Sequence, residues 1–167
     1  MSDGLRELLI IRHAKSDWSD DTLEDIDRPL AEKGKKQACK MSHWLAERDL
    51  IPDLILVSPA KRAQQTLSRL TRHWDKQPEV QTVDALYNAD LDTLIHTIKQ
   101  VPDSVQRVAV LGHNPGLEKL LAWLTGDEDN AHLATCAIAE VLIPSDWQHL
   151  EQAKAREVIR ATPKDAV

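Results

Sequence analysis

The sequence predicts a three-layer α/β/α sandwich around a mostly parallel central sheet. Strands of such a sheet are covered by helices on both faces, so they read as short runs that are apolar throughout. Three runs of this kind occur, at Leu8–Ile11, Leu54–Val57 and Val108–Leu111. Each is followed, directly or after a loop, by a stretch with helical spacing, which is typical of the α/β class. With 167 residues the chain suits one domain, assigned to 1–167.

Apolar spacing and capping signals predict two helices in the first half of the chain. The first covers Leu30 to Arg48. The second runs from Pro59 to about Trp74, with the Ser58 hydroxyl as its cap, because serine caps helices and proline is tolerated in the first turn. A weak strand is expected around Val80 to Val83.

The second half predicts two further helices. Asp90 is expected to cap a helix that Pro102 ends. Asn114 is expected to cap, and Pro115 to open, a helix that stops at Gly126.

Two later strands complete the predicted sheet. Ala137–Ile143 reads as a strand nearer the sheet edge. Glu157–Thr162 reads as a closing strand, although Leu150 to Arg156 has helical composition. No repeat, linker or low-complexity segment interrupts this order.

Four basic side chains follow the predicted strands. Arg12 and His13 come directly after the first run, Arg62 lies in the first turn of the helix after the second, and His113 follows the third. In open α/β sheets ligands bind beyond the carboxyl ends of the strands, and helix N-termini favour anions. Each side chain alone could be a solvated arginine or a capping histidine. Their coincidence at one edge indicates an anion site.

This set of residues suits phosphoryl transfer. A neutral His13 could attack phosphorus and become phosphohistidine, which water then hydrolyses. Arg12 and Arg62 match phosphate oxygens bidentately, and His113 could donate to the same oxygens. Ser16 is a further candidate for substrate binding. The sequence has no metal-ligand spacing of the common kinds, so no metal and no cofactor are expected.

Three ordered motifs resemble those of the histidine phosphatase superfamily. They are the Arg12-His13 pair, the Ser-Pro-x-x-Arg-Ala-x-Gln-Thr run at 58–66 and the Gly-His-Asn-Pro-Gly run at 112–116. The run at 27–30 and Gly34 resemble the SixA-type phosphohistidine phosphatases within it. The resemblance implies a phosphoglycerate mutase-like fold, His13 as nucleophile, and Arg12, Arg62 and His113 in the phosphate pocket. Ala14 stands where the signature often has glycine.

One part of that family pattern is missing. Many members place a glutamate before a Leu-Tyr segment as proton donor, and here Ala85 holds that position. Asp84 is one residue away, which in an extended segment turns its side chain to the other face. Asp27 is a second candidate acid. The gap favours activated phosphoryl groups such as phosphoramidates, whose leaving groups depart readily.

The loop after the first strand is strongly acidic. It is either a solvated loop or an acidic rim that repels multiply anionic metabolites and tolerates basic protein surfaces. Arg28, which ends it, could bind substrate or hold the loop by an ion pair. The acidic residues are Asp17, Asp20, Asp21, Glu24, Asp25 and Asp27.

Composition narrows the class of protein. The chain has 21 basic and 27 acidic residues and a net charge of −6, which disfavours nucleic acid as a partner. Cys39 and Cys136 offer no disulfide framework, and no apolar run is long enough for a membrane span, so a cytoplasmic protein is expected. The expected function is hydrolysis of protein phosphohistidine. The alternatives are a phosphatase of a small phosphorylated metabolite and a catalytically silent phosphate-binding module.

Overall fold

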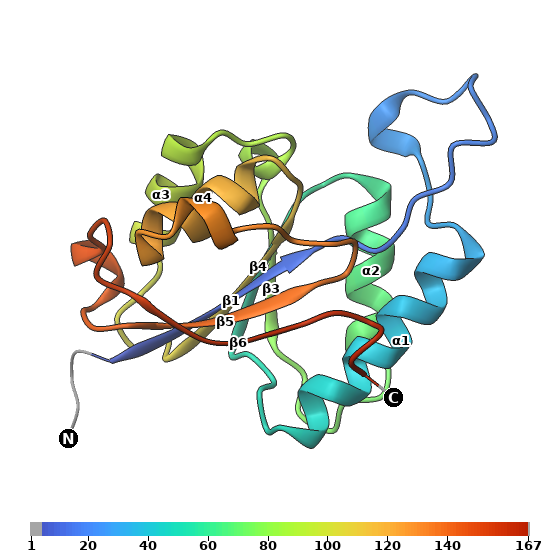
Figure 1. The fold of residues 1–167 in the computed structure, drawn as a ribbon. Coiled ribbons are helices and arrows are strands. Elements are labelled where there is room, and N and C mark those ends of the chain that lie inside the picture. The colour runs from blue at the N-terminus through green and yellow to red at the C-terminus, as the bar shows by residue number, and fades with distance from the viewer. Residues whose placement is uncertain (1–4, 167) are drawn as a thin grey trace.

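A six-stranded sheet lies at the centre of the computed structural model, which describes residues 5–166 (Figure 1). The strand order is β3-β2-β4-β1-β5-β6. The first four strands are mutually parallel, and β5 runs antiparallel to both of its neighbours. The predicted mostly parallel sheet is thus confirmed. The strands are β1 (Arg6–Arg12), β2 (Leu54–Val57), β3 (Glu79–Thr82), β4 (Arg107–Gly112), β5 (Ile138–Ile143) and β6 (Arg156–Ala161).

Helices cover both faces of this sheet, which confirms the three-layer sandwich (Figure 1). Leu8 and Ile10 of β1 pack toward α3 and α4. Leu9 and Ile11 pack toward α1 and α2. Because alternate side chains enter two separate cores, the strand must be apolar at every position. The helices are α1 (Glu32–Glu47), α2 (Lys61–Thr71), α3 (Leu91–Lys99) and α4 (Gly116–Thr125).

Three predicted helix starts are wrong by one or two residues. The first helix, α1, begins at Glu32 and not at Leu30. The N-cap of α2 is Ala60, and the Ser58 hydroxyl accepts a hydrogen bond from the Ala60 amide at 3.2 Å, so serine and proline form a turn before the helix. The residue that caps α4 is Pro115. The Asn114 side chain does not cap that helix but donates to the Leu133 carbonyl at 2.9 Å.

Several other boundaries are confirmed. Asp90 caps α3 by accepting from the Thr93 amide at 2.9 Å. Gly126 ends α4 with a φ of 77°, a left-handed conformation that glycine adopts without strain. The weak strand near Val80 is the exposed edge strand β3. The segment before β6 forms turns, so its helical composition did not produce a helix.

A close approach between α1 and the loop after β1 shapes one wall of the site. A Cβ atom on Gly34 would lie 2.1 Å from the Lys15 carbonyl oxygen, so only glycine permits this packing. The same oxygen accepts a hydrogen bond from the Ala31 amide at 2.9 Å, and Ser16 forms a β-bridge with Leu30. The loop after β1 is therefore fixed at both of its ends.

Candidate active site

A pocket of about 590 Å³ opens at the carboxyl edge of the parallel strands. Five predicted site residues line it together: Arg12, His13, Ser16, Arg62 and His113. They come from β1, the loop after it, α2 and the end of β4. The convergence expected from the strand ends is thus seen in the fold.

His13 is buried with a defined ring orientation. Its Nδ1 lies 2.7 Å from the Ala14 carbonyl oxygen, which only accepts hydrogen bonds. Nδ1 therefore carries the ring proton, and the lone pair is on Nε2. Burial, together with the charges of Arg62 and Arg12, lowers the pKa of His13 to about 4. The imidazole is neutral near pH 7 and has the protonation state that a nucleophile needs.

His113 lies beside it under the same influences. The two ring centroids are 5.1 Å apart, and Nε2 of His113 is 2.7 Å from the Ser58 hydroxyl oxygen. Burial, His13 and Arg62 lower the pKa of His113 to about 3. Two neutral rings beside two permanent cations give the pocket a net positive charge before any anion binds.

Both arginines are held by the backbone of other segments. Arg12 donates from Nη1 to the Leu133 carbonyl at 3.1 Å. Arg62 donates from Nη1 to the Asp25 carbonyl at 2.7 Å and from Nη2 to the Asp25 carboxylate at 3.0 Å. These contacts fix each guanidinium in place, which reduces the entropy lost when an anion binds.

Three polar atoms of the residues that line the pocket are buried without a hydrogen-bond partner among residues 5–166. They are Nε of Arg12, Nδ1 of His113 and Oδ1 of Asn114. Buried polar groups are nearly always paired. Of these atoms, Nε of Arg12 can only donate, so it favours a ligand that supplies oxygen acceptors, such as a phosphoryl group.

Asp25 is the carboxylate that lines this pocket, although in the sequence no motif distinguishes it from the other five acidic residues of the loop. The Tyr87 hydroxyl donates to the same carboxylate oxygen that Arg62 binds. The Tyr87 hydrogen bond, with Arg62, holds the pKa of Asp25 below its usual value. Asp25 is therefore ionised in the free protein and occupies part of the Arg62 fork.

The other acidic candidates lie elsewhere. Asp27 and Asp84 are exposed, and neither lines the pocket. The segment around Asp84 is a 3₁₀ turn over Asp84–Leu86 and not the extended chain that was expected from the sequence. The 3₁₀ turn Asp25–Asp27 determines which carboxylate of the acidic loop faces the site.

Arg28 holds the acidic loop. Its guanidinium stacks on the Trp18 ring at 4.3 Å and donates to the Asp20 carbonyl at 3.3 Å. Of the two roles considered for Arg28, these contacts favour the structural one. Trp18 itself lines the pocket and is 62% exposed.

Among residues 5–166 no group of three His, Cys, Asp or Glu side chains is arranged to hold a metal ion. The histidines outside the pocket are exposed; they are His43, His73, His96, His132 and His149. Within the same range no helix is long and apolar enough to cross a membrane.

Comparison with known proteins identifies the class to which this fold and site belong. The chain matches the model of the histidine phosphatase superfamily (branch 1) over residues 8–107, and it belongs to that superfamily. Arg12, His13 and Arg62 lie inside the matched segment, and His113 lies just beyond it. Membership supports phosphatase- or mutase-type catalysis.

Individual relatives specify the branch. Phosphohistidine phosphatase SixA of Escherichia coli is 28% identical over 161 residues, covering 89% of this chain and 99% of that protein. A candidate phosphohistidine phosphatase SixA structure from Nakamurella multipartitia superposes with a TM-score of 0.84 at 25% identity, covering 96% of this chain and 97% of the other. An uncharacterised protein of Mycobacterium leprae is 32% identical over 165 residues, 92% of this chain and 100% of its own length. The SixA-type branch and the phosphoglycerate mutase-like fold are confirmed.

Proposed function

We propose that this protein hydrolyses phosphohistidine on other proteins, through a phosphorylated His13 and without a metal ion. The orientation of His13 carries the proposal, because the hydrogen bond from Nδ1 to Ala14 leaves Nε2 free to attack. The relative named phosphohistidine phosphatase SixA supports the substrate class.

The reaction takes place in two displacements. Nε2 of His13 forms a bond to phosphorus while the bond from phosphorus to the substrate nitrogen breaks, and the departing imidazole keeps the electron pair and takes a proton from solvent. Water then attacks the phosphorus of phosphorylated His13. The bond between phosphorus and Nε2 breaks, its electron pair returns to the ring, a proton of the water passes to solvent, and orthophosphate leaves. Arg12, Arg62 and His113 hold the equatorial oxygens in both steps, so protein cations replace a metal in charge stabilisation.

The acidic side chains near the site indicate which leaving groups the protein can release. Asp25 is ionised and bound by Arg62 and Tyr87, so it is a poor proton donor. An alkoxide leaves slowly without a proton, whereas the imidazole of phosphohistidine is a far better leaving group. This difference favours a phosphoramidate over an alkyl phosphate metabolite.

The test measures hydrolysis of an aryl phosphate, which needs no leaving-group proton, in the presence of a chelator. We expect activity in the unmodified protein and its loss in His13→Ala. His96→Ala on α3, an exposed histidine, is the matched control. Acid-labile label from a ³²P-substrate should be trapped on the unmodified protein and on His96→Ala. Phosphate binding without turnover would instead assign a silent binding module.

A further inference from the structure

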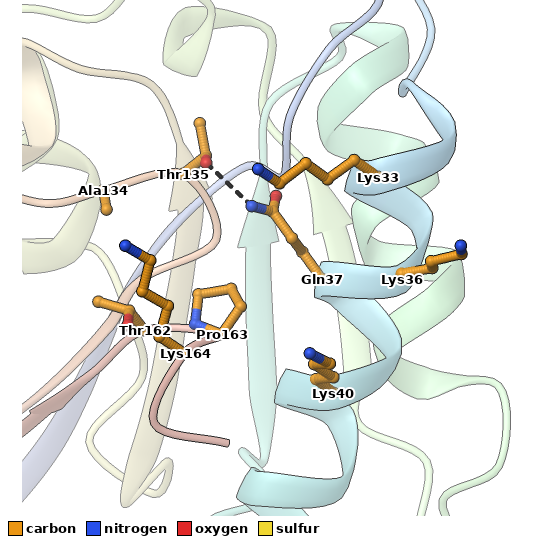
Figure 2. Close-up of a pocket in the computed structure, with 9 residues that line it drawn as sticks. All are labelled: Lys33, Lys36, Gln37, Lys40, Ala134, Thr135, Thr162, Pro163 and Lys164. Carbon is orange, nitrogen blue, oxygen red and sulfur yellow. Dashed lines mark hydrogen bonds between the residues drawn. The ribbon is translucent and has the colours of Figure 1, made fainter. Parts of the chain in front are cut away.

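A second cleft lies beside the active-site pocket, between α1 and the segment that follows β6 (Figure 2). Its volume is about 470 Å³. Four exposed lysines line it, and we call it the lysine cleft. They are Lys33, Lys36 and Lys40 of α1 and Lys164 of the opposite wall.

The lysine cleft concentrates positive charge in an acidic protein. The chain has a net charge of −6. Nevertheless, none of the four ammonium groups forms an ion pair within 4 Å of a carboxylate in residues 5–166. The nearby Glu32 pairs with Lys35, outside the cleft, and Asp165 accepts from Thr162. Like charges gathered on one surface repel one another, so this arrangement favours an anionic partner.

The two walls present their charges differently. In Figure 2 Lys33 extends from α1 toward Thr135, and Lys164 extends from the C-terminal segment toward Ala134. The ammonium group of Lys36 points away from the cleft in the same view. Lys33 and Lys164 are therefore the two lysines best placed to contact a bound segment.

The lysine cleft adjoins the active-site pocket. Thr135 lines both hollows. Gln37 donates from Nε2 to the Thr135 hydroxyl at 3.2 Å and accepts at Oε1 from the Lys15 amide at 3.0 Å. Lys15 also lines the active-site pocket. The two hollows therefore share a border, formed by Thr135 and Gln37, that a chain bound at the active site could cross.

We infer that the lysine cleft binds an acidic segment flanking the phosphohistidine of a protein substrate. This rests on the proposed function and deepens it. Lys33 and Lys40 are seven residues apart, about 10 Å along the helix, a span that an extended peptide covers in about three residues. The exposed lysines are spread along a cleft that Ala134 and Pro163 also line. Such an arrangement suits a peptide whose carboxylates are separated along its length better than it suits a single compact anion.

The experiment compares three substrates. These are a phosphohistidine peptide with aspartates on one side of the histidine, the same peptide with asparagines in their place, and an aryl phosphate. The test variant is Lys33→Gln/Lys164→Gln. Lys99→Gln/Lys154→Gln removes the same charge away from the lysine cleft and is the matched control.

We expect KM for the aspartate peptide to rise about five- to tenfold in the test variant, the effect of losing two solvent-exposed ion pairs. Its kcat should stay within about twofold, because the contacts bind ground and transition states equally. The asparagine peptide, the aryl phosphate and the control variant should be unaffected. Added salt should weaken the preference for the aspartate peptide.

Other results would overturn the inference without touching the proposed function. Equal KM values for both peptides in the unmodified protein would show that the lysines do not recognise the aspartates. An equal rise in KM for the aryl phosphate in the test variant would mean that the lysines attract any anion without binding a flanking segment. Competition by tripolyphosphate, with no preference between peptides, would assign the cleft to a phosphorylated metabolite. Loss of all three activities in His13→Ala keeps the proposed function intact in each case.

Discussion

At the carboxyl ends of β1 and β4 two buried histidines lie beside two arginines, whereas at the amino end of β1 the buried Glu140 of β5 lies beside a second glutamate, Glu7. Burial and cations lower the pKa of His13 to about 4. Burial and the neighbouring Glu7 raise the pKa of Glu140 to about 7. Both regions thus favour the neutral form of a buried group, by opposite shifts.

The two regions differ in what remains uncompensated. At the amino end Arg107 pairs with Glu7 at 3.1 Å. When one proton is shared by Glu7 and Glu140, the remaining negative charge is balanced by the positive charge of Arg107. At the carboxyl end Asp25 offsets part of the charge of Arg62. Arg12 donates to one backbone carbonyl, and the charge of Glu118 acts on it from beyond ion-pair distance. Perturbed pKa values occur in functional and in structural clusters alike. Here a surplus of one charge sign, open to a pocket, distinguishes the site.

The largest effect is expected at the carboxyl end. Arg62→Ala should reduce kcat/KM for an aryl phosphate by at least about 2 kcal/mol, roughly thirtyfold or more, because a charged donor to the transition state is lost. Arg72→Ala, an exposed arginine at the end of α2, is the control. Thermal unfolding of both variants checks that the fold is kept. An unchanged kcat/KM would remove Arg62 from the site.

The pH dependence of activity tests the histidine end directly. His13 must be neutral to attack, so kcat/KM should be level above pH 5 and fall about tenfold for each unit below pH 4. The unfolded chain protonates its histidines near pH 6.5, so stability also falls as the pH drops from there toward 4. Circular dichroism at each pH separates the two effects. An acid limb near pH 6.5 would contradict the lowered pKa.

The glutamate end should respond through stability. Glu140 is ionised above about pH 4.5 in the unfolded chain but only above about 7 in the folded one, so its ionisation destabilises the fold as the pH rises through that window. Glu140→Gln should therefore increase the free energy of unfolding by about 1–2 kcal/mol at pH 8 and by clearly less at pH 5, near the start of that window. Urea unfolding at both values measures this. The exposed Glu151→Gln is the control, and equal gains at both pH values would refute the explanation.

The smallest effect concerns the carboxylate that compensates Arg62. Asp25→Asn should bind orthophosphate about fivefold more tightly, a gain of about 1 kcal/mol, because the carboxylate no longer competes for the guanidinium. Isothermal titration calorimetry measures the affinity. Asp27→Asn and Asp84→Asn, which lie outside the pocket, should bind as the unmodified protein does. Weaker binding in Asp25→Asn would mean that this side chain mainly positions Arg62.

Sequence reasoning located Arg12, His13, Arg62 and His113 because parallel strands end at one edge, a rule that needs no side-chain detail. It did not identify Asp25, because the conformation of the 3₁₀ turn Asp25–Asp27 decides which carboxylate of the acidic loop faces the pocket. Serine is a common N-cap residue, so Ser58 was expected to cap α2. Its hydroxyl instead accepts from the Ala60 amide in the turn before the helix and contacts His113.

The contact between Glu7 and Glu140 could not be predicted from the sequence for a different reason. β5 pairs antiparallel with β1 in a register that sets Glu140 opposite Leu9 and Leu142 opposite Glu7. Glu7 and Glu140 are therefore diagonal neighbours on two adjacent strands. Strand pairing and register depend on contacts between residues far apart in the chain. The alternation of apolar and polar residues within one strand does not reveal them.

The exposure of Trp18 gives the protein its own optical probe. All five tryptophans lie within residues 5–166; three are buried, Trp123 is half-buried, and Trp18 stands at the mouth of the pocket against the Arg28 guanidinium. Its fluorescence emission should be red-shifted relative to the buried indoles and should change when an anion or a peptide enters. Occupancy of the site could then be followed without a label.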